Sequence, residues 1–477
     1  MKRKLLGLAL AAVTGLAAVV MPSEADAAAY GAAFQVSITY QNVGTTATPV
    51  NIDFYPENNG TATSFSAGTL NPKASASLLV GSVTGLGSSF KGSAVLSAEQ
   101  PVIATVVQFA SGIANRPLSN GFSRGASKQL VATVLKNSSN YSTIFSVQNA
   151  GAAAANVTVQ FFAAGSTTAA HTITVPNLAA NAARYFDATQ IAELGATFSG
   201  SAIVSSSTDV VVGVNELQVN GNGASSFEGT PNSGARVYMP SANCEYVGLF
   251  STFYAVQNAS QSAPLDFQVR YKINGQADVI DGPYSLPAGA KRSIAGCAKM
   301  PRGSIGSAIV ERTNGTGTLV AVGKVAGGNI TSSFLGAVEG TGSTNVALPY
   351  VRWSPNATFG SGARQRTDIA IQNISSTAAT NVRVQYVDRN GSVVGTHTIG
   401  NIAAGQKASS NPAAGNALDP CGRFGEYGGG ADCLGTSFGG GAIVLADAGS
   451  LVTVARVYTG NPTQAGEDYT GMNVSGQ

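Results

Sequence analysis

The sequence has little charge and few of the side chains on which most active sites depend. Only 11% of its 477 residues are charged, and it contains two histidines, one tryptophan and four cysteines. An average soluble domain has about 25% charged residues. The 27 basic and 24 acidic residues form no cluster, which argues against a nucleic-acid partner. Hydrophobic residues make up 44% of the chain, so it can bury a core and is not disordered.

The chain has one long apolar run, and this run lies at the N-terminus. Basic residues at 2–4 precede an apolar run over 5–20, and the small-x-small sequence ADA follows at 25–27. This order is typical of a secretory signal peptide, here residues 1–27. A membrane anchor would need ~20 apolar residues, and no later run is long enough. We therefore predict a secreted protein, extracellular or at the cell surface, without a transmembrane segment.

Four cysteines in an exported chain indicate disulfides rather than metal ligands. Three pairings are possible, and pairing of sequence neighbours joins Cys244 to Cys297 and Cys421 to Cys433. Each bridge then lies within one repeat of the chain. A zinc site is the alternative, but the sequence lacks a Cys-x-x-Cys pair. We predict no metal and no cofactor.

A short motif that contains Gln-Asn recurs four times. It reads ITYQNVG at 38–44, FSVQNAG at 145–151, YAVQNAS at 254–260 and IAIQNIS at 369–375. Successive motifs are 107, 109 and 115 residues apart, which indicates tandem domains rather than the shorter repeats of a solenoid. Asn149 is expected to bond backbone groups of the turn after its strand, and Gln148 to reach an edge carbonyl or solvent. Four copies argue against a single active site.

The same series of strands and turns follows each motif. In the second copy it comprises VTVQFF (157–162), a turn with glycine, a strand that ends in NLAANA (177–182), the small-residue strand FSGSAIVS (198–205) and VVVGVNEL (210–217). A further strand precedes the second, third and fourth motifs. About seven alternating strands in ~100 residues are typical of an immunoglobulin-like β-sandwich, and a jelly roll is the alternative.

The sequence thus predicts an all-β fold of four tandem immunoglobulin-like antiparallel β-sandwich domains, which together form a semi-rigid rod. After the signal peptide, the predicted domains are residues 28–127, 128–234, 235–343 and 344–477, here called repeats one to four. Repeat four has a Gly-rich insertion that Cys421 and Cys433 would clamp, and it ends in a tail. A clamped loop on a rigid sandwich is a candidate recognition site, and plain surface padding is the alternative.

The recurring unit, VQNxG…VxVxxY…LxAGxx…GSAxVxS, resembles the immunoglobulin-like repeats of bacterial surface and adhesion-type proteins, among them exported repeat proteins of Chloroflexi-like bacteria. The resemblance covers nearly all of the mature chain. It implies a fold and a surface location. It implies no catalytic residue, because such proteins are mostly structural or adhesive.

The side chains that could carry chemistry fit repeated strands and turns better than a site. His171 and His397 occupy the same place in repeats two and four, whereas a Ser-His-Asp relay would be needed only once. The sequence DRNG at 388–391 hints at a calcium loop, but the equivalent turns lack carboxylates. Trp353 begins WSPNATFG (353–360), which is expected to form part of an interdomain elbow. We predict no catalytic residues and no enzyme activity.

Repeat one is too short at its start to hold the strand that precedes the other motifs. Only 14 residues separate Ala28 from Asn42. An unfilled strand position exposes an edge that invites pairing with another chain. The tail EDYTGMNVSGQ at 467–477 is a candidate donor, in which Tyr469 would match Phe227 of repeat two. Donation to the next chain would build an open head-to-tail filament.

These observations predict a non-enzymatic, secreted structural protein of the cell surface, such as a component of a filament, a sheath or a surface layer. The expected partners are further copies of the chain or other cell-surface proteins, and no nucleic acid. The alternative is an adhesin or glycan-binding protein that uses domain loops, mainly those of repeat four.

Overall fold

The structure, a computed structural model, describes residues 28–87, 89–328, 330–354, 359, 364–418, 437–459 and 465–474. Regular structure in this part of the chain consists of β-strands and short 3₁₀ turns, which confirms the all-β prediction. Strands form where apolar and polar residues alternate. In LDFQVRYKI (Leu265–Ile273), every second side chain is buried, because successive side chains of a strand point to opposite faces.

The first two repeats contain fourteen of the strands. Repeat one has β1 (Gln35–Asn42), β2 (Thr48–Pro56), β3 (Thr63–Leu70), β4 (Ser75–Leu79), β5 (Gly92–Ala98), β6 (Val102–Phe109) and β7 (Leu118–Asn120), with the turn η1 (Val80–Ser82). Repeat two has β8 (Ala126–Lys136), β9 (Tyr141–Asn149), β10 (Ala155–Ala163), β11 (Ala169–Leu178), β12 (Ala183–Asp187), β13 (Phe198–Gln218) and β14 (Ala224–Glu228), with the turns η2 (Ala188–Gln190) and η3 (Ala192–Leu194).

The last two repeats contain the remaining strands. Repeat three has β15 (Arg236–Cys244), β16 (Ser251–Asn258), β17 (Leu265–Ile273), β18 (Val279–Leu286), β19 (Lys291–Ala295), η4 (Gly296–Ala298), β20 (Ser304–Gly315), β21 (Leu319–Gly327), β22 (Ile330–Leu335) and β23 (Ala337–Val338). Repeat four has β24 (Asn345–Trp353), β25 (Gln365–Asn373), β26 (Ala379–Asp388), β27 (Val393–Ile402), β28 (Lys407–Ser410), β29 (Phe438–Leu445), β30 (Leu451–Thr459), β31 (Ala465–Thr470) and β32 (Met472–Asn473).

Repeat three shows most simply how the strands of one repeat are arranged. Its strands β15 to β22, taken in order as first to eighth, form the sheets β18-β17-β20-β15-β23 and β19-β16-β21-β22. The pairings are antiparallel, and the two sheets enclose a core that includes Met239, Phe267 and Tyr271. The other repeats use the same order, except that no first strand lies beside β5 among the described residues of repeat one. In repeat two the long β13 serves as both sixth and seventh strand, and in repeat four β24 also pairs with β25.

The strand order differs from that of an immunoglobulin domain at its edge strands. The fourth strand β18 pairs with the third strand β17, whereas the fourth strand of a constant-type immunoglobulin domain pairs with the fifth. The first and seventh strands differ as well. In immunoglobulin domains the first strand pairs with the second and the seventh with the sixth. Here the first strand β15 pairs with the sixth strand β20, and the seventh strand β21 pairs with the second strand β16. The sixth strand therefore depends on the first strand to cover its edge.

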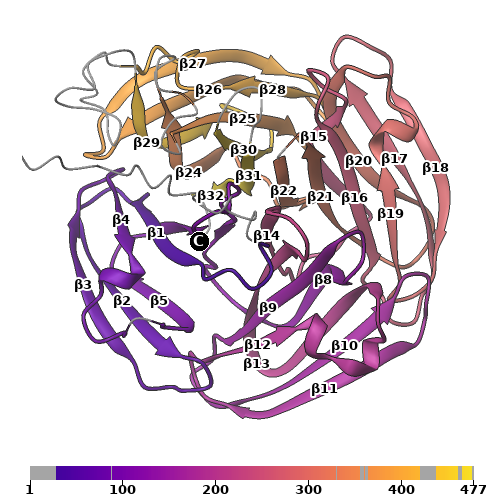
Figure 1. Cartoon of the computed structure of the whole chain (residues 1–477). Helices are drawn as coiled ribbons and strands as arrows, with labels where there is room; N and C mark the ends of the chain where they lie inside the picture. Colours follow the sequence, from indigo (N-terminus) through magenta and orange to yellow (C-terminus); the bar gives the residue numbers. More distant parts are fainter. Residues whose placement is uncertain are drawn as a thin grey trace, which may run out of the picture.

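The four repeats lie in a closed circle, with β14, β22 and β31 near its middle (Figure 1). The first strand of one repeat contacts the second and seventh strands of the next: β8 contacts β16 and β21, β15 contacts β25 and β30, and β24 contacts β1 and β6. The innermost strands β7, β14, β22 and β31 also contact one another in a cycle. The expected rod is therefore wrong. A similar side-by-side contact turns the chain at each junction, and the turns close a ring.

One hydrogen bond recurs between neighbouring repeats. The serine of the GSA sequence donates to a turn carbonyl of the next repeat: Ser93 Oγ to Asn181 O at 2.7 Å, Ser201 Oγ to Gly289 O at 3.1 Å and Ser307 Oγ to Gly405 O at 3.0 Å. Repeat four has Gly441 in this place, where a Cβ would lie 2.9 Å from Gln41 Nε2 of repeat one. The small residues of this strand therefore lie at the contacts between neighbouring repeats.

The predicted interdomain elbow at Trp353 is also wrong. Trp353 ends β24 and pairs with Arg366 of β25, and both strands belong to repeat four. The segment therefore connects two strands of one repeat. Residues 355–358 and 360–363 of it lie outside the described part.

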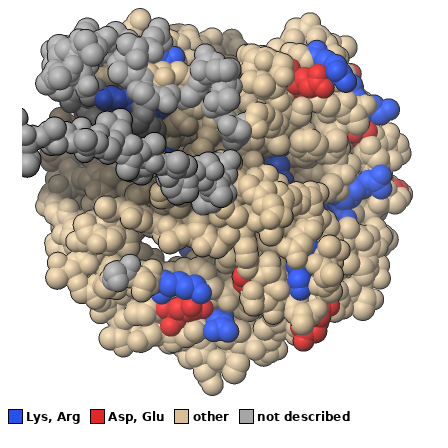
Figure 2. All heavy atoms as spheres, in the orientation of Figure 1, with Lys and Arg blue, Asp and Glu red and all other residues tan. Residues whose placement is uncertain are grey.

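The surface carries few charges. Lys, Arg, Asp and Glu gather in small mixed groups on the face shown in Figure 2, with no field of one sign. Within the described residues, no helix is both long and apolar enough to cross a membrane.

Candidate functional site

The asparagine of the repeated motif closes a turn, as the sequence predicted. Asn149 is fully buried. Its Nδ2 donates to Ala153 O at 2.7 Å and Leu178 O at 3.0 Å, and its Oδ1 accepts from Gly151 N at 2.9 Å. Its counterparts make matching bonds to the turn and to the end of the fourth strand; they are Asn42, Asn258 and Asn373.

The glutamine of the motif lies at the junctions between repeats. Gln148 Nε2 donates to Asn181 O at 3.1 Å, the carbonyl that also accepts from Ser93 of repeat one. Gln41 and Gln372 donate to the equivalent carbonyls at 2.9 and 3.1 Å. Gln257 is buried, and its side chain has no hydrogen-bond partner among the described residues. Gln372 Nε2 also donates to Ala308 O of repeat three at 3.3 Å, so at this junction the motif glutamine itself joins two repeats.

Buried charges form further junction contacts that the sequence did not indicate. Lys324 of repeat three donates to Glu216 of repeat two, whose side chain is 3% exposed. Lys291 lies near this pair, and burial, with a smaller effect of the Lys324 charge, lowers the pKa of Lys291 to about 8. Lys291 Nζ also donates to Ser199 Oγ at 3.2 Å. No local pattern marks these residues, because their partners lie in another repeat.

Glu228 forms a contact between the inner strands of repeats one and two. It ends β14, and its carboxyl group accepts a hydrogen bond from the backbone N–H of Asn120 in β7. Glu228 is 8% exposed, and burial raises its pKa to about 7. The protonation state of Glu228 near neutral pH therefore affects the stability of this junction.

The largest difference between the repeats lies at the sixth strand. In repeat two, Ala202, Ile203 and Val204 are fully buried beside β8. Their counterparts in β5, residues 94–96, are all partly exposed. The sheet β3-β2-β5 ends at β5, and no other strand of the described residues pairs with its far edge. Among the described residues, repeat one therefore has no strand in the first position, and residues 1–27 lie outside this part of the chain.

The start of the described chain does not cover β5. Ala29 N donates to Gly221 O at 2.8 Å and Tyr30 N to Gln218 O at 2.9 Å. The Tyr30 hydroxyl donates to Asp187 at 2.7 Å. Residues 28–30 are thus held by repeat two.

The tail does not provide the missing strand either. β31 pairs with β30, and β32 pairs with β24. Tyr469 takes the place that Phe227 has in repeat two, as expected, and its hydroxyl donates to Tyr350 O at 2.7 Å. Arg456 donates to both carboxylate oxygens of Asp468 at 2.8 Å. The tail is therefore the eighth strand of its own repeat, whereas the position without a strand among the described residues of repeat one is the first. The expected donation from this tail is not supported.

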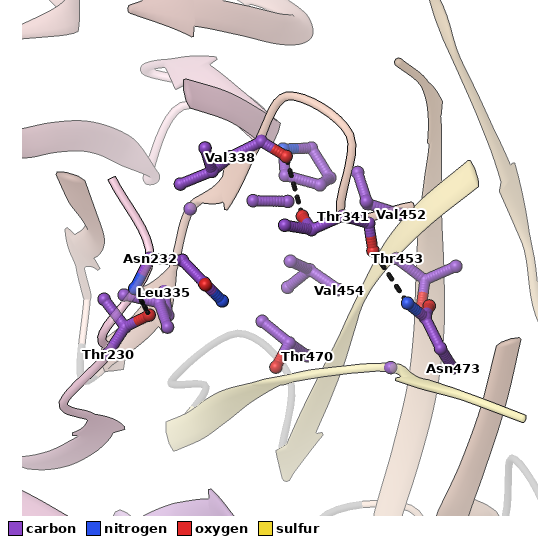
Figure 3. A pocket seen from close by; sticks show the side chains of 14 residues that line it. Thr230, Asn232, Leu335, Val338, Thr341, Val452, Thr453, Val454, Thr470 and Asn473 are labelled. Atoms are coloured by element: carbon purple, nitrogen blue, oxygen red, sulfur yellow. Dashed lines mark hydrogen bonds between the residues drawn. The ribbon is translucent and has the colours of Figure 1, made fainter. Parts of the chain in front are cut away.

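A cavity of about 250 Å³ lies where repeats two, three and four meet (Figure 3). Its lining includes Thr230, Asn232, Val338, Thr453 and Asn473. Thr453 is 2% exposed, and its Oγ1 has no hydrogen-bond partner among the described residues. The lining combines hydroxyl and amide groups with aliphatic side chains, so the cavity suits a small uncharged polar molecule.

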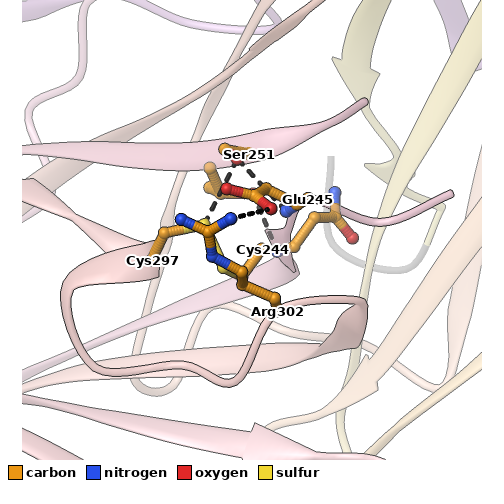
Figure 4. Close-up of a disulfide and its surroundings, with 7 residues drawn as sticks. Cys244, Glu245, Ser251, Cys297 and Arg302 are labelled. Carbon is orange, nitrogen blue, oxygen red and sulfur yellow. Dashed lines mark hydrogen bonds and ion pairs between the residues drawn. A yellow bond between two sulfur atoms is a disulfide. The ribbon is translucent and has the colours of Figure 1, made fainter. Parts of the chain in front are cut away.

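The predicted bridge between Cys244 and Cys297 is present in repeat three (Figure 4). It joins the end of β15 to η4. Ser251 Oγ lies 3.3 Å from Cys297 Sγ, and Arg302 forms an ion pair with Glu245 at 3.3 Å. The predicted partners Cys421 and Cys433 lie outside the described residues.

The two histidines and the DRNG turn take part in local contacts. His171 Nε2 lies 3.8 Å from a carboxylate oxygen of Glu193, and His397 Nδ1 lies 2.9 Å from Ser410 Oγ. Asp388 accepts from the N–H groups at positions 390 and 392, at 3.0 and 2.8 Å, so its carboxylate closes a hairpin turn. Across the described ranges, no three or more His, Cys, Asp or Glu side chains gather as a metal site.

Comparison of the chain with family models, with curated proteins and with solved structures finds no match.

Proposed function

We propose that this protein is a secreted, non-enzymatic structural protein of the cell surface, a component of a filament, a sheath or a surface layer. We also propose that its repeats are four tandem immunoglobulin-like sandwich domains with exchanged first and seventh strands. The observation that carries the proposal is the use of the repeated side chains. The motif asparagines hold turns, and the GSA serines join repeats.

A rigid building block is the function that such a ring supports best. Polar side chains that could otherwise bind a substrate are buried in contacts between repeats, and these contacts recur around the ring. The low charge and mixed surface groups suit close association with other copies or other surface proteins. The uncovered edge of β5 leaves one position at which the ring can be joined to something else.

Electron microscopy of native cells tests this proposal. Gold-labelled antibodies against the protein should mark a continuous layer, sheath or filament, and material sheared from the cells should contain ring-shaped units in regular contact. Dispersed rings found only in the culture medium would contradict it.

The cavity supports an adhesin or glycan-binding protein as a second candidate. Hydroxyl and amide groups on its wall could bind sugar hydroxyls. A glycan array probed with the wild type and with Asn232→Ala tests this, because Asn232 lines the cavity and is exposed. A signal that the substitution abolishes would favour glycan binding. No signal, or one that the substitution leaves unchanged, would count against the cavity.

A further inference from the structure

We propose that the uncovered edge of β5 binds an extended segment of a separate protein, which completes repeat one as its missing first strand. The inference rests on the proposed function in one respect, since it assumes that the ring is part of a larger assembly. Strand addition to a sheet edge combines backbone hydrogen bonds with pockets for alternate side chains, and β5 offers both.

The backbone groups at the open edge can be identified from the pairing on the other side. Glu57 N donates to Lys91 O at 2.9 Å, so Glu57 and Lys91 form a hydrogen-bonded pair of the β2–β5 ladder. Such pairs alternate along an antiparallel ladder. Ser93, Val95 and residue 97 therefore bond to β2. The N–H and C=O groups of residues 94 and 96 point to the open edge.

The other repeats show which side chains fit beside these groups. The sixth-strand alanine lies opposite Val131 in repeat two, Met239 in repeat three and Leu348 in repeat four. These three side chains belong to the cores of their repeats. Two positions earlier, the first strands have Gln129, Val237 and Val346. The partner should therefore present a large aliphatic residue opposite Ala94 and a second core-facing residue, preferably aliphatic, opposite Leu96.

In repeat one, the surfaces that a first strand would cover are present and partly exposed. Ala94 and Leu96 are partly exposed at the margin of its core. Phe122 is 39% exposed. Phe122 lies two residues after the end of β7, just as Met472 lies two residues after the end of β31. Met472 pairs with the outer edge of the first strand β24. Phe122 thus stands where repeat one would contact the far side of the missing strand.

With the spacing of repeat two, the residues at the equivalent sequence position of this chain have the wrong chemistry. Counted back from the motif asparagine, Glu24 stands where repeat two has Val131, and Asp26 stands where it has Thr133. A carboxylate at the Val131 position would have to enter the core, which is costly without a partner. A segment from elsewhere with aliphatic residues fits better.

A second ring is a poorer occupant than a free segment. At the other junctions the first strand lies between its own sixth strand and the next repeat, as β8 does between β13 and the strands β16 and β21. The corresponding place beside β5 is therefore bounded by repeat two and is one strand wide. Figure 2 shows a small opening on this face, close to where repeats one and two meet. A β5 strand that is itself part of a ring could not enter such a place.

The chain provides its own probe for this site. A synthetic peptide of residues 127–136, SKQLVATVLK, should bind the mature protein at β5 as β8 binds β13. Binding is measured by isothermal titration calorimetry, and the site is located by hydrogen exchange. We expect slowed exchange at the amides of Ala94 and Leu96. No binding, or protection elsewhere only, would overturn the proposal.

Two methylated peptides separate strand pairing from unspecific adhesion. A methyl group on the backbone nitrogen of Val131 removes a donor that faces the sixth strand, because Val131 is paired with Ala202. A methyl group on the nitrogen of Leu130 removes one that faces the other side, toward Thr230. We expect at least tenfold weaker binding for the first peptide than for the second. Equal affinities would contradict an antiparallel strand at β5.

A protein variant distinguishes the occupants and separates this inference from the proposed function. Ala94→Pro removes an N–H at the open edge and none that bonds to β2, so repeat one should still fold; Ala94→Ser is the matched control. Ala94→Pro should abolish peptide binding. If the wild type forms dimers without peptide and Ala94→Pro is monomeric, the occupant is a second copy and the proposal fails. Surface layers that still form with Ala94→Pro would also sink it, whereas peptide binding without any surface layer would defeat only the proposed function.

Discussion

Repeats one and two have nearly the same sixth strand, GSAVLS and GSAIVS, but differ in what lies beside it. In repeat two, β8 covers the strand and its aliphatic side chains are fully buried. In repeat one, the same kinds of side chain remain partly exposed. The alternation of a strand thus determines which side chains face the core, whereas their burial depends on a neighbour that another part of the sequence must supply. Repeat one thus presents the surface for a first strand that its described residues do not contain.

Removal of a strand that is present should have the largest effect. Deletion of residues 467–477 takes away most of β31 and all of β32, and it leaves the mostly buried Arg456 without its ion-pair partner Asp468. Loss of one partner of a buried ion pair costs about 3–5 kcal/mol, and the loss of Tyr469 adds to it. Circular dichroism should show a separate, lower melting transition for repeat four. An unchanged melting curve would mean that a repeat does not need its inner strand.

The pH dependence should reveal Glu228, the acid between repeats one and two. Its pKa is about 7 in the folded protein and near 4.5 when unfolded, so between these values the folded state binds more protons. The stabilisation is complete below pH 4.5 and is lost as the pH rises to 7, by about 3 kcal/mol in total. Denaturant unfolding of the wild type and Glu228→Gln at pH 4.5, 6 and 7.5 should show that the substitution removes this slope. Parallel curves would contradict the assignment.

Asn149→Ala should destabilise repeat two by about 2–3 kcal/mol, because it leaves buried carbonyl groups without a donor. The usual effect of a lost turn contact is about 1 kcal/mol. The full burial of Asn149 raises the expected cost. Asn42→Ala in repeat one is the matched variant, and chemical denaturation compares the two. An effect below about 0.5 kcal/mol would show that water replaces the lost bonds.

The junction serines should have the smallest effect. Ser201→Ala and Ser93→Ala each remove one hydrogen bond between repeats, worth about 1 kcal/mol. At the junction of repeats two and three, β8 adds further contacts, whereas no first strand lies at the junction of repeats one and two within the described part of the chain. Hydrogen exchange near the junction should therefore increase more for Ser93→Ala. Equal increases would mean that the first strand adds little to a junction.

The sequence predicts the features that depend on the local residue pattern and on the spacing of the repeated motif. Alternation identifies the strands, the spacing of the motif asparagines marks the repeats, and the short start of repeat one predicts an exposed strand edge there. The role of Asn149 followed from the turn after it, because its partners at positions 151 and 153 are close in sequence.

Contacts between repeats could not be predicted in this way. Ser93 and Asn181 are 88 residues apart, and Lys324 and Glu216 are 108 apart. Neither pair shows a local pattern, so the sequence predicts a rod in place of the ring and does not indicate the buried charges. Alternation also does not say which strands are neighbours, and for that reason the exchanged first and seventh strands came only from the structure. The sequence predicts an open edge in repeat one, but it does not predict which backbone groups of β5 face that edge.

Residue-resolved hydrogen exchange of the mature protein without any partner tests the central claim most directly. If β5 lacks a neighbour, the amides of Ala94 and Leu96 should exchange much faster than those of Ala202 and Val204 in repeat two. The amide of Val95, which faces β2, should stay protected and so show that repeat one remains folded. Protection of Ala94 and Leu96 equal to that of Ala202 and Val204 would contradict the account, because the edge would then already be covered.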